Sequence, residues 1–502
     1  MTRLHLWISF IVCLALIIFG IDRGFEISDE GFYMLLSVPA QENENGLINY
    51  DLFFKLFYQL TGCTFSLVEM RLMRLFGCFL GAYALTHFLK NQFDILLNKY
   101  QLFLLSILGL FSGYAFLSPT LSYNSLTVVL GCFWLWTIFS DKSSNYPRVL
   151  ILGFVLALLV YVKVTVALIL FLCSIGIWVS KKQFSMDSFG LVFIPFLILE
   201  FIFWAILGEF ASARLVIGIP LNSARPGYGI IQMIKSPLVG FLFSGVTLMM
   251  GWMIAKLKLK SFQIQVGFLL FISAIFFWII RFTHITEEWN HVLMLTTSAF
   301  LGYLLGNSKS EITFSLEKMT LFLLPYFLHL GSNFYWLRIA VHYWVFWMLL
   351  VLVYIGRNSN VMQYLVTLLS VILVFNGIWW HPYGQDNSLW STKIELNADG
   401  EIIKVDKELF DAIIQIKDFA KERELRLIHT AYGVPGLIWL SGLQIPHSPS
   451  VWNRIQLESL SYNLPEEMVF CQNDLLPDEW NFTHSKTLGS IQGHPTIYLL
   501  WK

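Results

Sequence analysis

A succession of long hydrophobic segments dominates the sequence and limits what the chain can fold into. About thirteen segments are long enough, or nearly so, to cross a bilayer as helices. Hydrophobic residues make up 56% of the chain and charged residues only 13%, about half the charged share of a soluble domain. We therefore predict a mainly α-helical polytopic membrane protein. The approximate segments are 4–21, 67–89, 101–117, 122–140, 148–161, 164–180, 188–207, 237–255, 264–281, 290–306, 319–333, 338–355 and 361–379.

Basic residues in the short loops predict the orientation. Lysine and arginine gather in alternate loops, which favours a cytoplasmic N-terminus. An odd number of segments then puts residues 380–502 outside, together with a long first loop at about 22–66 and the loops near 208–236 and 282–289. The two segments that flank Lys163 can also be read as one long tilted helix. We expect two units, a transmembrane domain at 1–379 and an extracytoplasmic domain at 380–502.

The C-terminal unit and the first loop both show regular patterns. Residues 406–422 have helical periodicity, while 426–429, 468–471 and 496–500 are typical of short strands. This pattern predicts a small α/β domain of mildly acidic composition, and such a charge balance argues against a nucleic-acid partner. In the first loop, 32–38 and 51–60 are predicted as short helices in the membrane interface.

An acidic pair, Asp29 and Glu30, stands just beyond the first hydrophobic segment. Adjacent carboxylates repel each other and gain nothing from lipid. A general base, a cation site, an arginine or lysine partner, or a solvated turn would each account for them. The aromatic residues Phe32 and Tyr33 follow directly, which places the pair at the head of an amphipathic stretch.

The stretch Asp29-Glu30-Gly31-Phe32-Tyr33 resembles the acidic element in the first extracytoplasmic loop of GT-C glycosyltransferases. That group includes protein O-mannosyltransferases and lipid A aminoarabinose transferases. The single N-terminal segment, the long first loop and the outside C-terminal domain are similar to this group as well. The resemblance implies a sugar donor carried on polyprenyl phosphate, an extracytoplasmic lipid, glycan or protein acceptor, and a bacterial inner-membrane location. It also implies that Asp29, with Glu30 beside it, is the catalytic carboxylate.

Such a reaction needs cations that absorb the charge of the leaving phosphate. Arg71 and Arg74 lie three residues apart at the start of the second segment, where snorkelling to the interface is the alternative interpretation. Lys163 stands amid apolar residues, a costly position that favours a functional role over a plain turn. Arg281, at an outside turn, is a further candidate for phosphate binding.

Other residues are candidates for contact with the acceptor or for a lid over the donor. Many GT-C members carry a second acidic residue in the next outside loop, but the turn at 118–124 has none, and Asn124 stands there instead. We therefore predict that no metal or other cofactor is needed, because a divalent ion favours several carboxylate ligands. The candidates are Tyr33, Asn124, Arg225, Tyr228 and His284.

Two other classes of membrane protein remain open at this point. A polymerase or ligase of surface polysaccharide is polytopic too, but its large loop usually lies late in the chain between two spans. A flippase or transporter of lipid-linked sugars places charges near mid-bilayer, whereas this chain keeps them near segment ends. Cys63 and Cys471 lie outside the hydrophobic segments and would pair only if folding brings them together.

Overall fold

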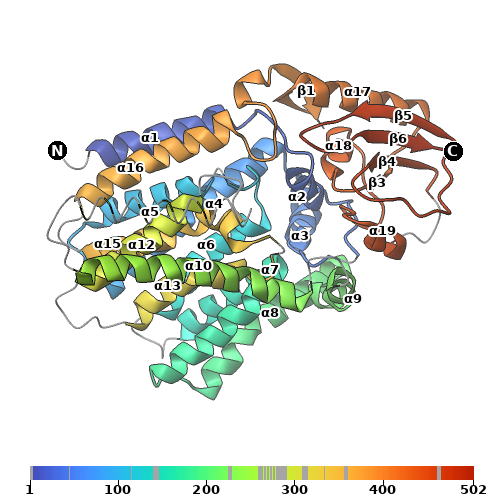
Figure 1. Ribbon diagram of the computed structural model, residues 1–502. Helices are drawn as coiled ribbons and strands as arrows, with labels where there is room; N and C mark the ends of the chain where they lie inside the picture. The colour runs from blue at the N-terminus through green and yellow to red at the C-terminus, as the bar shows by residue number, and fades with distance from the viewer. Residues whose placement is uncertain are drawn as a thin grey trace.

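The computed structural model combines a bundle of helices with a smaller α/β unit at one end (Figure 1). It describes residues 4–44, 46–114, 116–139, 146–223, 229–257, 291–307, 315–332, 334–355, 360–398, 400–460 and 465–502, with isolated positions between 264 and 278. The predicted segment at 264–281 lies mostly outside these residues.

The helices of the bundle coincide with the predicted hydrophobic segments. Five of the described helices are long and apolar enough to cross a membrane, and large apolar side chains such as Leu197 and Phe201 lie exposed on their outer faces. Such a surface suits lipid rather than water, and the helices indicate a multi-pass membrane protein. The bundle contains α1 (Leu4–Phe19), α4 (Leu67–Gln92), α5 (Lys99–Tyr114), α6 (Tyr123–Ile138), α7 (Tyr146–Ser180), α8 (Met186–Leu207), α10 (Ile230–Leu257), α12 (His291–Asn307), α13 (Leu316–His329), α14 (Trp336–Ile339), η1 (Ala340–Tyr343), α15 (Trp344–Ile355), α16 (Asn360–Val374) and η3 (Phe375–Trp380).

Helix α7 is interrupted at Lys163, whose backbone is not helical (φ −159°, ψ 89°). Before the break, Gly153 packs on Val192 of α8, and the Tyr161 hydroxyl donates to Glu200, so this half runs in the same direction as α8. After the break, Phe171 packs again near the start of α8, against Phe189 and Phe193. The two halves therefore run in opposite directions. The prediction of two segments that meet at Lys163 agrees with this geometry.

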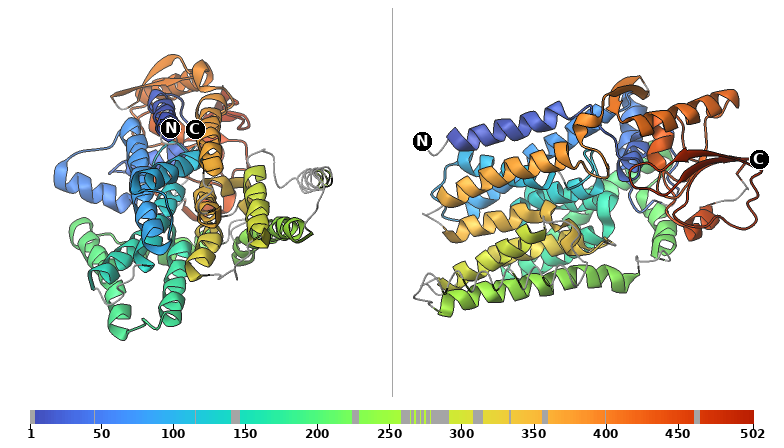
Figure 2. Two further views of the ribbon diagram at one scale, coloured as in Figure 1. Left: turned by 90° about the vertical axis from the view of Figure 1, so that its left-hand side faces the viewer. Right: turned by 45° about the horizontal axis from the view of Figure 1, so that its top comes forward.

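The first loop forms two helices between the bundle and the α/β unit (Figures 1 and 2). Helices α2 (Asp29–Ser37) and α3 (Asp51–Thr61) match the two predicted there. Close approach at Gly31 fixes the position of α2, because a Cβ at Gly31 would lie 2.2 Å from Cα of Gly436 in α18 (Pro435–Leu440). The first loop is thus packed tightly onto the C-terminal unit.

The α/β unit contains a four-stranded mixed sheet in the order β3-β4-β6-β5, with β3 and β4 parallel and the other pairs antiparallel. A separate hairpin precedes it. The predicted helix at 406–422 is confirmed, as are the strands near 468–471 and 496–500, whereas the strand expected at 426–429 begins later. The elements are η4 (Leu389–Ser391), β1 (Ile394–Ala398), β2 (Glu401–Val405), α17 (Lys407–Glu422), β3 (His429–Ala431), α19 (Arg454–Leu460), β4 (Glu467–Cys471), β5 (His484–Gly489) and β6 (Ile497–Trp501).

Backbone and side-chain hydrogen bonds join the first loop to the α/β unit. The amide of Gly24 donates to the Lys404 carbonyl at 2.8 Å, and the amide of Lys404 donates to the Asp22 carbonyl at 2.9 Å. The side chain of Gln492 accepts from the Ile27 amide at 3.0 Å and donates to the Phe25 carbonyl. The segment before Asp29 is therefore held like an additional strand of the α/β unit.

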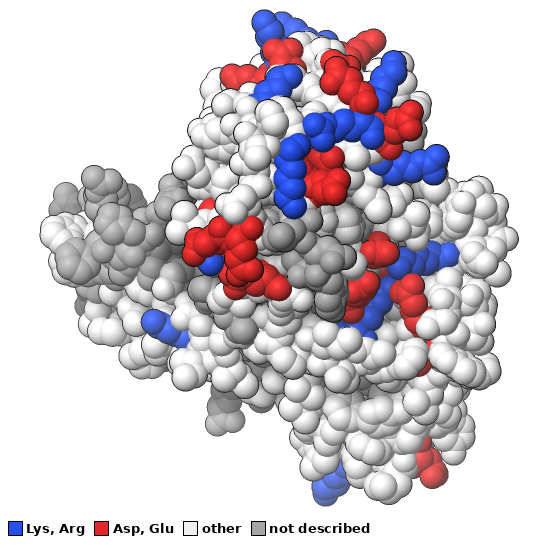
Figure 3. Space-filling model, turned by 90° about the vertical axis from the view of Figure 1, so that its right-hand side faces the viewer, with Lys and Arg blue, Asp and Glu red and all other residues white. Residues whose placement is uncertain are grey.

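Charged side chains are unevenly distributed. Seen from the end that carries the α/β unit, lysine, arginine, aspartate and glutamate gather over the upper and central part, while the lower helices are almost free of charge (Figure 3). This separation fits an α/β unit in water and a bundle in lipid.

Candidate functional site

Asp29 begins helix α2 and is held by a residue that follows the last helix of the bundle. The hydroxyl of Tyr383, which follows η3, donates to Oδ2 of Asp29 at 2.6 Å. The Asp29 side chain keeps some accessible surface but is surrounded by protein atoms. Desolvation raises the pKa of its carboxyl, and the hydrogen bond from Tyr383 partly offsets that rise. Asp29 thus combines partial access with a fixed orientation.

Tyrosine side chains surround Asp29 on the side of the bundle. Tyr33 follows one helical turn after Asp29 in α2, and its ring lies 6.0 Å from that of Tyr123 at the start of α6. Burial, and next the charge of Asp29, raise the pKa of the Tyr33 hydroxyl well above its ordinary value. Tyr50, just before α3, donates to the Leu121 carbonyl at 3.4 Å. These aromatic rings connect α2 to the end of the bundle.

Glu26 is a further carboxylate close to Asp29. Glu26 is buried and caps α2, because it accepts from the Ser28 amide at 2.7 Å and from the Glu30 amide at 2.8 Å. Burial, and next the charge of Asp29, raise the pKa of Glu26 well above its ordinary value. Glu26 was not among the predicted site residues, although it stands three positions before Asp29.

Glu30 and Arg71 form an ion pair inside the protein. Both side chains are almost completely buried, and the guanidinium donates to the two carboxylate oxygens at 3.0 and 2.9 Å. Its other three N–H groups donate to backbone carbonyls of the loop after α1, at 2.8–2.9 Å. These acceptors are Ile21, Arg23 and Gly24.

This pairing changes the interpretation of both residues. All five N–H groups of the Arg71 guanidinium are engaged, so none is left for a phosphate. Both oxygens of Glu30 accept from Arg71, so Glu30 is poorly placed to take a proton. The structure favours a structural role for Glu30 and Arg71 over the predicted catalytic and phosphate-binding roles. An arginine partner, one of the alternatives for the acidic pair, therefore applies to Glu30.

Arg74 is also directed into the protein rather than toward a ligand. Its guanidinium donates to the Tyr114 carbonyl at 2.5 Å, to the Leu117 carbonyl at 3.3 Å and to the Ser118 carbonyl, and it lies 3.7 Å from the Tyr114 ring centroid. Its Nε is buried without a hydrogen-bond partner. Arg74 thus anchors the end of α5 and the following turn through three of its five N–H groups.

Lys163 stands at the reversal of α7, at the same end of the bundle as Tyr123. Its ammonium lies 5.7 Å from the Tyr123 ring centroid and donates to the Leu328 carbonyl at 3.1 Å, to the Ser332 hydroxyl at 3.0 Å and to the His329 carbonyl at 3.5 Å. These contacts engage its three N–H groups, so Lys163 would act on a phosphate through its charge or by giving up one of them. The side chain is buried. Lys163 is thus a predicted phosphate ligand that lies beside Tyr123, whose ring contacts that of Tyr33.

Several buried polar atoms near this site have no hydrogen-bond partner. They are Oδ1 of Asn124, the hydroxyl of Tyr343 and Nδ1 of His329. Asn124 was a predicted acceptor contact, whereas Tyr343 and His329 were not predicted. A buried polar atom without a partner is uncommon and requires an explanation, such as a bound ligand or water.

The remaining predicted residues cannot be placed against this site. Arg225, Tyr228, Arg281 and His284 all lie outside the described residues. In its described part, the loop predicted near 208–236 forms helix α9 (Ala211–Ser223) and the start of α10.

Helix α9 is fastened to the first loop by a buried ion pair. Arg214 donates to both carboxylate oxygens of Asp51, at 2.9 and 2.8 Å, and also pairs with Glu209. This contact holds α9 on the N-terminal end of α3.

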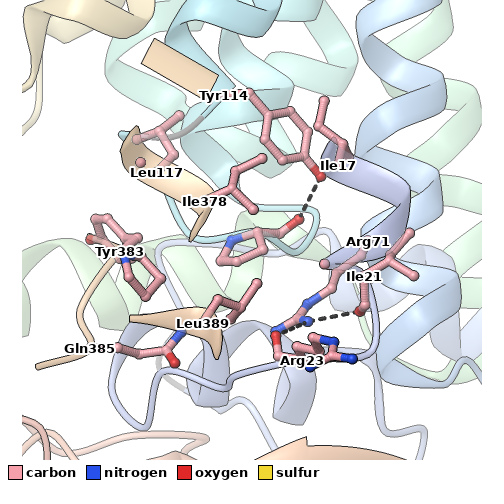
Figure 4. Close-up of a pocket in the computed structure, with 14 residues that line it drawn as sticks. Ile17, Ile21, Arg23, Arg71, Tyr114, Leu117, Ile378, Tyr383, Gln385 and Leu389 are labelled. Atoms are coloured by element: carbon pink, nitrogen blue, oxygen red, sulfur yellow. Dashed lines mark hydrogen bonds between the residues drawn. The ribbon is translucent and has the colours of Figure 1, made fainter. Parts of the chain in front are cut away.

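A small cavity lies beside the tyrosine that holds Asp29 (Figure 4). Its volume is about 30 Å³, enough for a water molecule or two. Nε of Arg23 and Oε1 of Gln385 are buried here without hydrogen-bond partners. Space therefore borders Tyr383 on the side of the loop after α1. The lining includes Ile17, Ile21, Arg23, Arg71, Tyr114, Leu117, Ile378, Tyr383, Gln385 and Leu389.

Comparison with known proteins does not place the chain in a family. No family model, no curated protein and no solved structure matches it. A function must therefore be inferred from the residues and from their arrangement.

The cysteines do not form the pair considered from the sequence. Cys63 is exposed and Cys471 is buried, and both are free thiols.

Tyr383 is expected to set the pH at which Asp29 ionises. A hydrogen bond to a carboxylate favours its charged form, so Tyr383→Phe should raise the pKa of Asp29 further. If Asp29 must be ionised to act as a base, the acid limb of the kcat/KM profile will move to higher pH, by about one pH unit. The measurement is the pH dependence of the sugar transfer that the resemblance implies, with Tyr364→Phe at the opposite end of the bundle as control. An unmoved acid limb would contradict the assignment.

If the chain transfers sugar as the resemblance implies, this transfer is expected to persist in excess EDTA. With Glu30 bound to Arg71, few free carboxylates remain near Asp29 to ligate a divalent ion. Among the described residues, the cluster whose possible ligand atoms lie within 4.8 Å of one another is Glu42, Glu44 and His447, at the surface between the first loop and the α/β unit. Loss of transfer in EDTA, with rescue by Mg²⁺ or Mn²⁺, would overturn this prediction.

Proposed function

We propose that this chain is an integral membrane glycosyltransferase of the GT-C type. It would move a sugar from a polyprenyl-phosphate donor to an extracytoplasmic lipid, glycan or protein. Counting α7 as two spans, and including the predicted segment at 264–281, the chain would cross the membrane about thirteen times. The N-terminus would be cytoplasmic, and the α/β unit would lie in the periplasm of a bacterial cell.

One observation carries this proposal. A partly exposed carboxylate, that of Asp29, and a buried ammonium, that of Lys163, border the same group of tyrosines at one end of the bundle. Tyr33 is on the helix that Asp29 begins, and its ring lies 6.0 Å from that of Tyr123. Lys163 lies 5.7 Å from the Tyr123 ring centroid on the inner side. A base and a cation at such positions suit transfer from a phosphate leaving group.

The reaction assigns each group a role. Asp29 takes the proton of the acceptor hydroxyl or amine as the acceptor atom attacks the anomeric carbon of the sugar. The bond from that carbon to the phosphate oxygen breaks, and the electron pair leaves with the polyprenyl phosphate. Lys163 stabilises the charge that develops there. Tyr383 is a positioning residue, because it holds one oxygen of Asp29 and leaves the other to accept the proton.

The α/β unit contributes by shaping the loop that carries Asp29. Gln492 and Lys404 hold the preceding segment, and Gly436 allows α2 to approach closely. The orientation of Asp29 therefore depends on residues from both ends of the chain.

The experiment that tests this function uses the purified protein in nanodiscs. The protein is given labelled polyprenyl-phosphate sugars and a crude envelope acceptor. Both the released polyprenyl phosphate and the labelled product are measured. Transfer supports the proposal. If no donor is cleaved while lipid-linked sugar crosses a proteoliposome membrane, the protein is a transporter and the proposal is wrong.

A further inference from the structure

His329 lies at the C-terminal end of α13 and is completely buried. Its Nε2 contacts the Phe334 carbonyl oxygen at 2.9 Å and the Ser236 hydroxyl at 3.1 Å. Its Nδ1 is buried and has no hydrogen-bond partner. One edge of the imidazole is therefore held by the protein, and a polar atom of the ring is left unsatisfied.

The contact with Phe334 decides which nitrogen carries the proton. A carbonyl oxygen only accepts hydrogen bonds, so Nε2 must donate to it. In the neutral ring, Nδ1 then carries a lone pair and acts as an acceptor. A positive charge on the imidazole would be repelled by the nearby Lys163 ammonium. An acceptor buried without a donor costs free energy, so a bound molecule that supplies a proton would stabilise this arrangement.

His329 borders the proposed site directly. The Lys163 ammonium lies 3.5 Å from the His329 carbonyl oxygen. The ring of Tyr343 stands edge-on to the imidazole, with centroids 6.3 Å apart, and its hydroxyl is also buried without a partner. Unsatisfied polar atoms therefore lie deep in the bundle, beside the cation proposed to hold the donor phosphate.

The chemistry of Nδ1 limits the group that binds there. A phosphate or carboxylate carries no proton to donate at neutral pH, and its charge would meet a lone pair. An amine would be protonated, and the Lys163 ammonium would repel it. An uncharged hydroxyl satisfies Nδ1 without either penalty. We infer that His329 binds an uncharged hydroxyl of the donor sugar through Nδ1.

This inference rests on the proposed function, and its test separates the two. Wild-type protein is given farnesyl phosphate that carries mannose, glucosamine or glucuronate, and KM and kcat are measured for each. His329→Gln keeps an N–H for Phe334 but lacks the Nδ1 acceptor, whereas His329→Asn keeps an acceptor near the Nδ1 position. His484→Gln, on exposed strand β5, is the matched control. Competition by farnesyl phosphate alone reports phosphate binding without the sugar.

The expected result has two parts. His329→Gln raises KM for the donor that wild-type protein uses best about tenfold, and His329→Asn restores much of the loss. The inhibition constant of farnesyl phosphate stays unchanged in all variants, because Lys163 is intact. An unaltered KM in His329→Gln would overturn the inference alone. No cleavage of any donor by wild-type protein would overturn the proposed function and the inference with it.

Discussion

Replacing Asp29 by asparagine is expected to lower sugar transfer about 10²–10⁴-fold, the usual contribution of a general base. Asparagine keeps the size of the side chain and can still accept from the Tyr383 hydroxyl, but its amide cannot take the acceptor proton. Folding should be little affected, because Asp29 makes its single described side-chain hydrogen bond to Tyr383. The measurement is the rate of labelled transfer by wild-type and variant protein reconstituted at equal amounts.

A matched control separates the loss of a base from a general change in loop charge. Glu44→Gln removes one carboxylate from the same loop, and its side chain is about half exposed. This variant should transfer sugar at the wild-type rate. Near-normal activity of Asp29→Asn would show that Asp29 is not the base, whatever the control does.

Arg71→Ala is expected to cost about 3–5 kcal/mol of stability, the range found when one partner of a buried ion pair is removed. The Glu30 carboxylate would stay buried without its cation, and three carbonyls of the loop after α1 would lose their donors. Because that loop leads to Asp29, the active-site segment should lose its order first. The measurement is the thermal unfolding midpoint of the purified protein, followed by intrinsic tryptophan fluorescence.

The double variant Glu30→Met/Arg71→Met tests the physical reason. Removing both charges leaves no ion unpaired, so this protein should be more stable than Arg71→Ala alone. Arg454→Ala, which breaks an exposed pair with Glu458, should change the unfolding midpoint little. A fully stable Arg71→Ala that binds farnesyl phosphate poorly would restore the phosphate-binding role predicted from the sequence.

The helices of the bundle could be predicted because their signal is local. A long apolar run is a helix in lipid or in a core, and either environment requires backbone hydrogen bonds within the segment. Lys163 marked the reversal of α7 for the same reason, since a charged residue seldom lies in the middle of a span. Helix α17 was also predictable, because its apolar residues recur at helical spacing.

Strand β5 could not be predicted from the local sequence pattern. Four of its six residues are exposed, and His484, Ser485 and Lys486 lack the apolar alternation that predicts a strand. It forms because β6 offers unpaired backbone groups beside it. Hairpin β1–β2 was likewise missed, although Leu396 and Ile403 point inward on its two strands.

The site was only partly visible in the sequence. Asp29 and Lys163 stood out because each is a charged residue against an apolar background. Tyr383 did not, because its contact with Asp29 spans 354 positions. His329 gave no local signal either, since a histidine at a helix end has many uses.

The sequence by itself determined which segments enter lipid and which charged residues would be costly there. Both properties follow from the transfer free energy of single side chains, which composition records directly. The tertiary structure decided the partners of those charges. Arg71 could bind a phosphate or Glu30, and only the approach of α4 to α2 makes the carboxylate its partner. That choice depends on distances between remote segments, and the chemical type of a residue does not encode such distances.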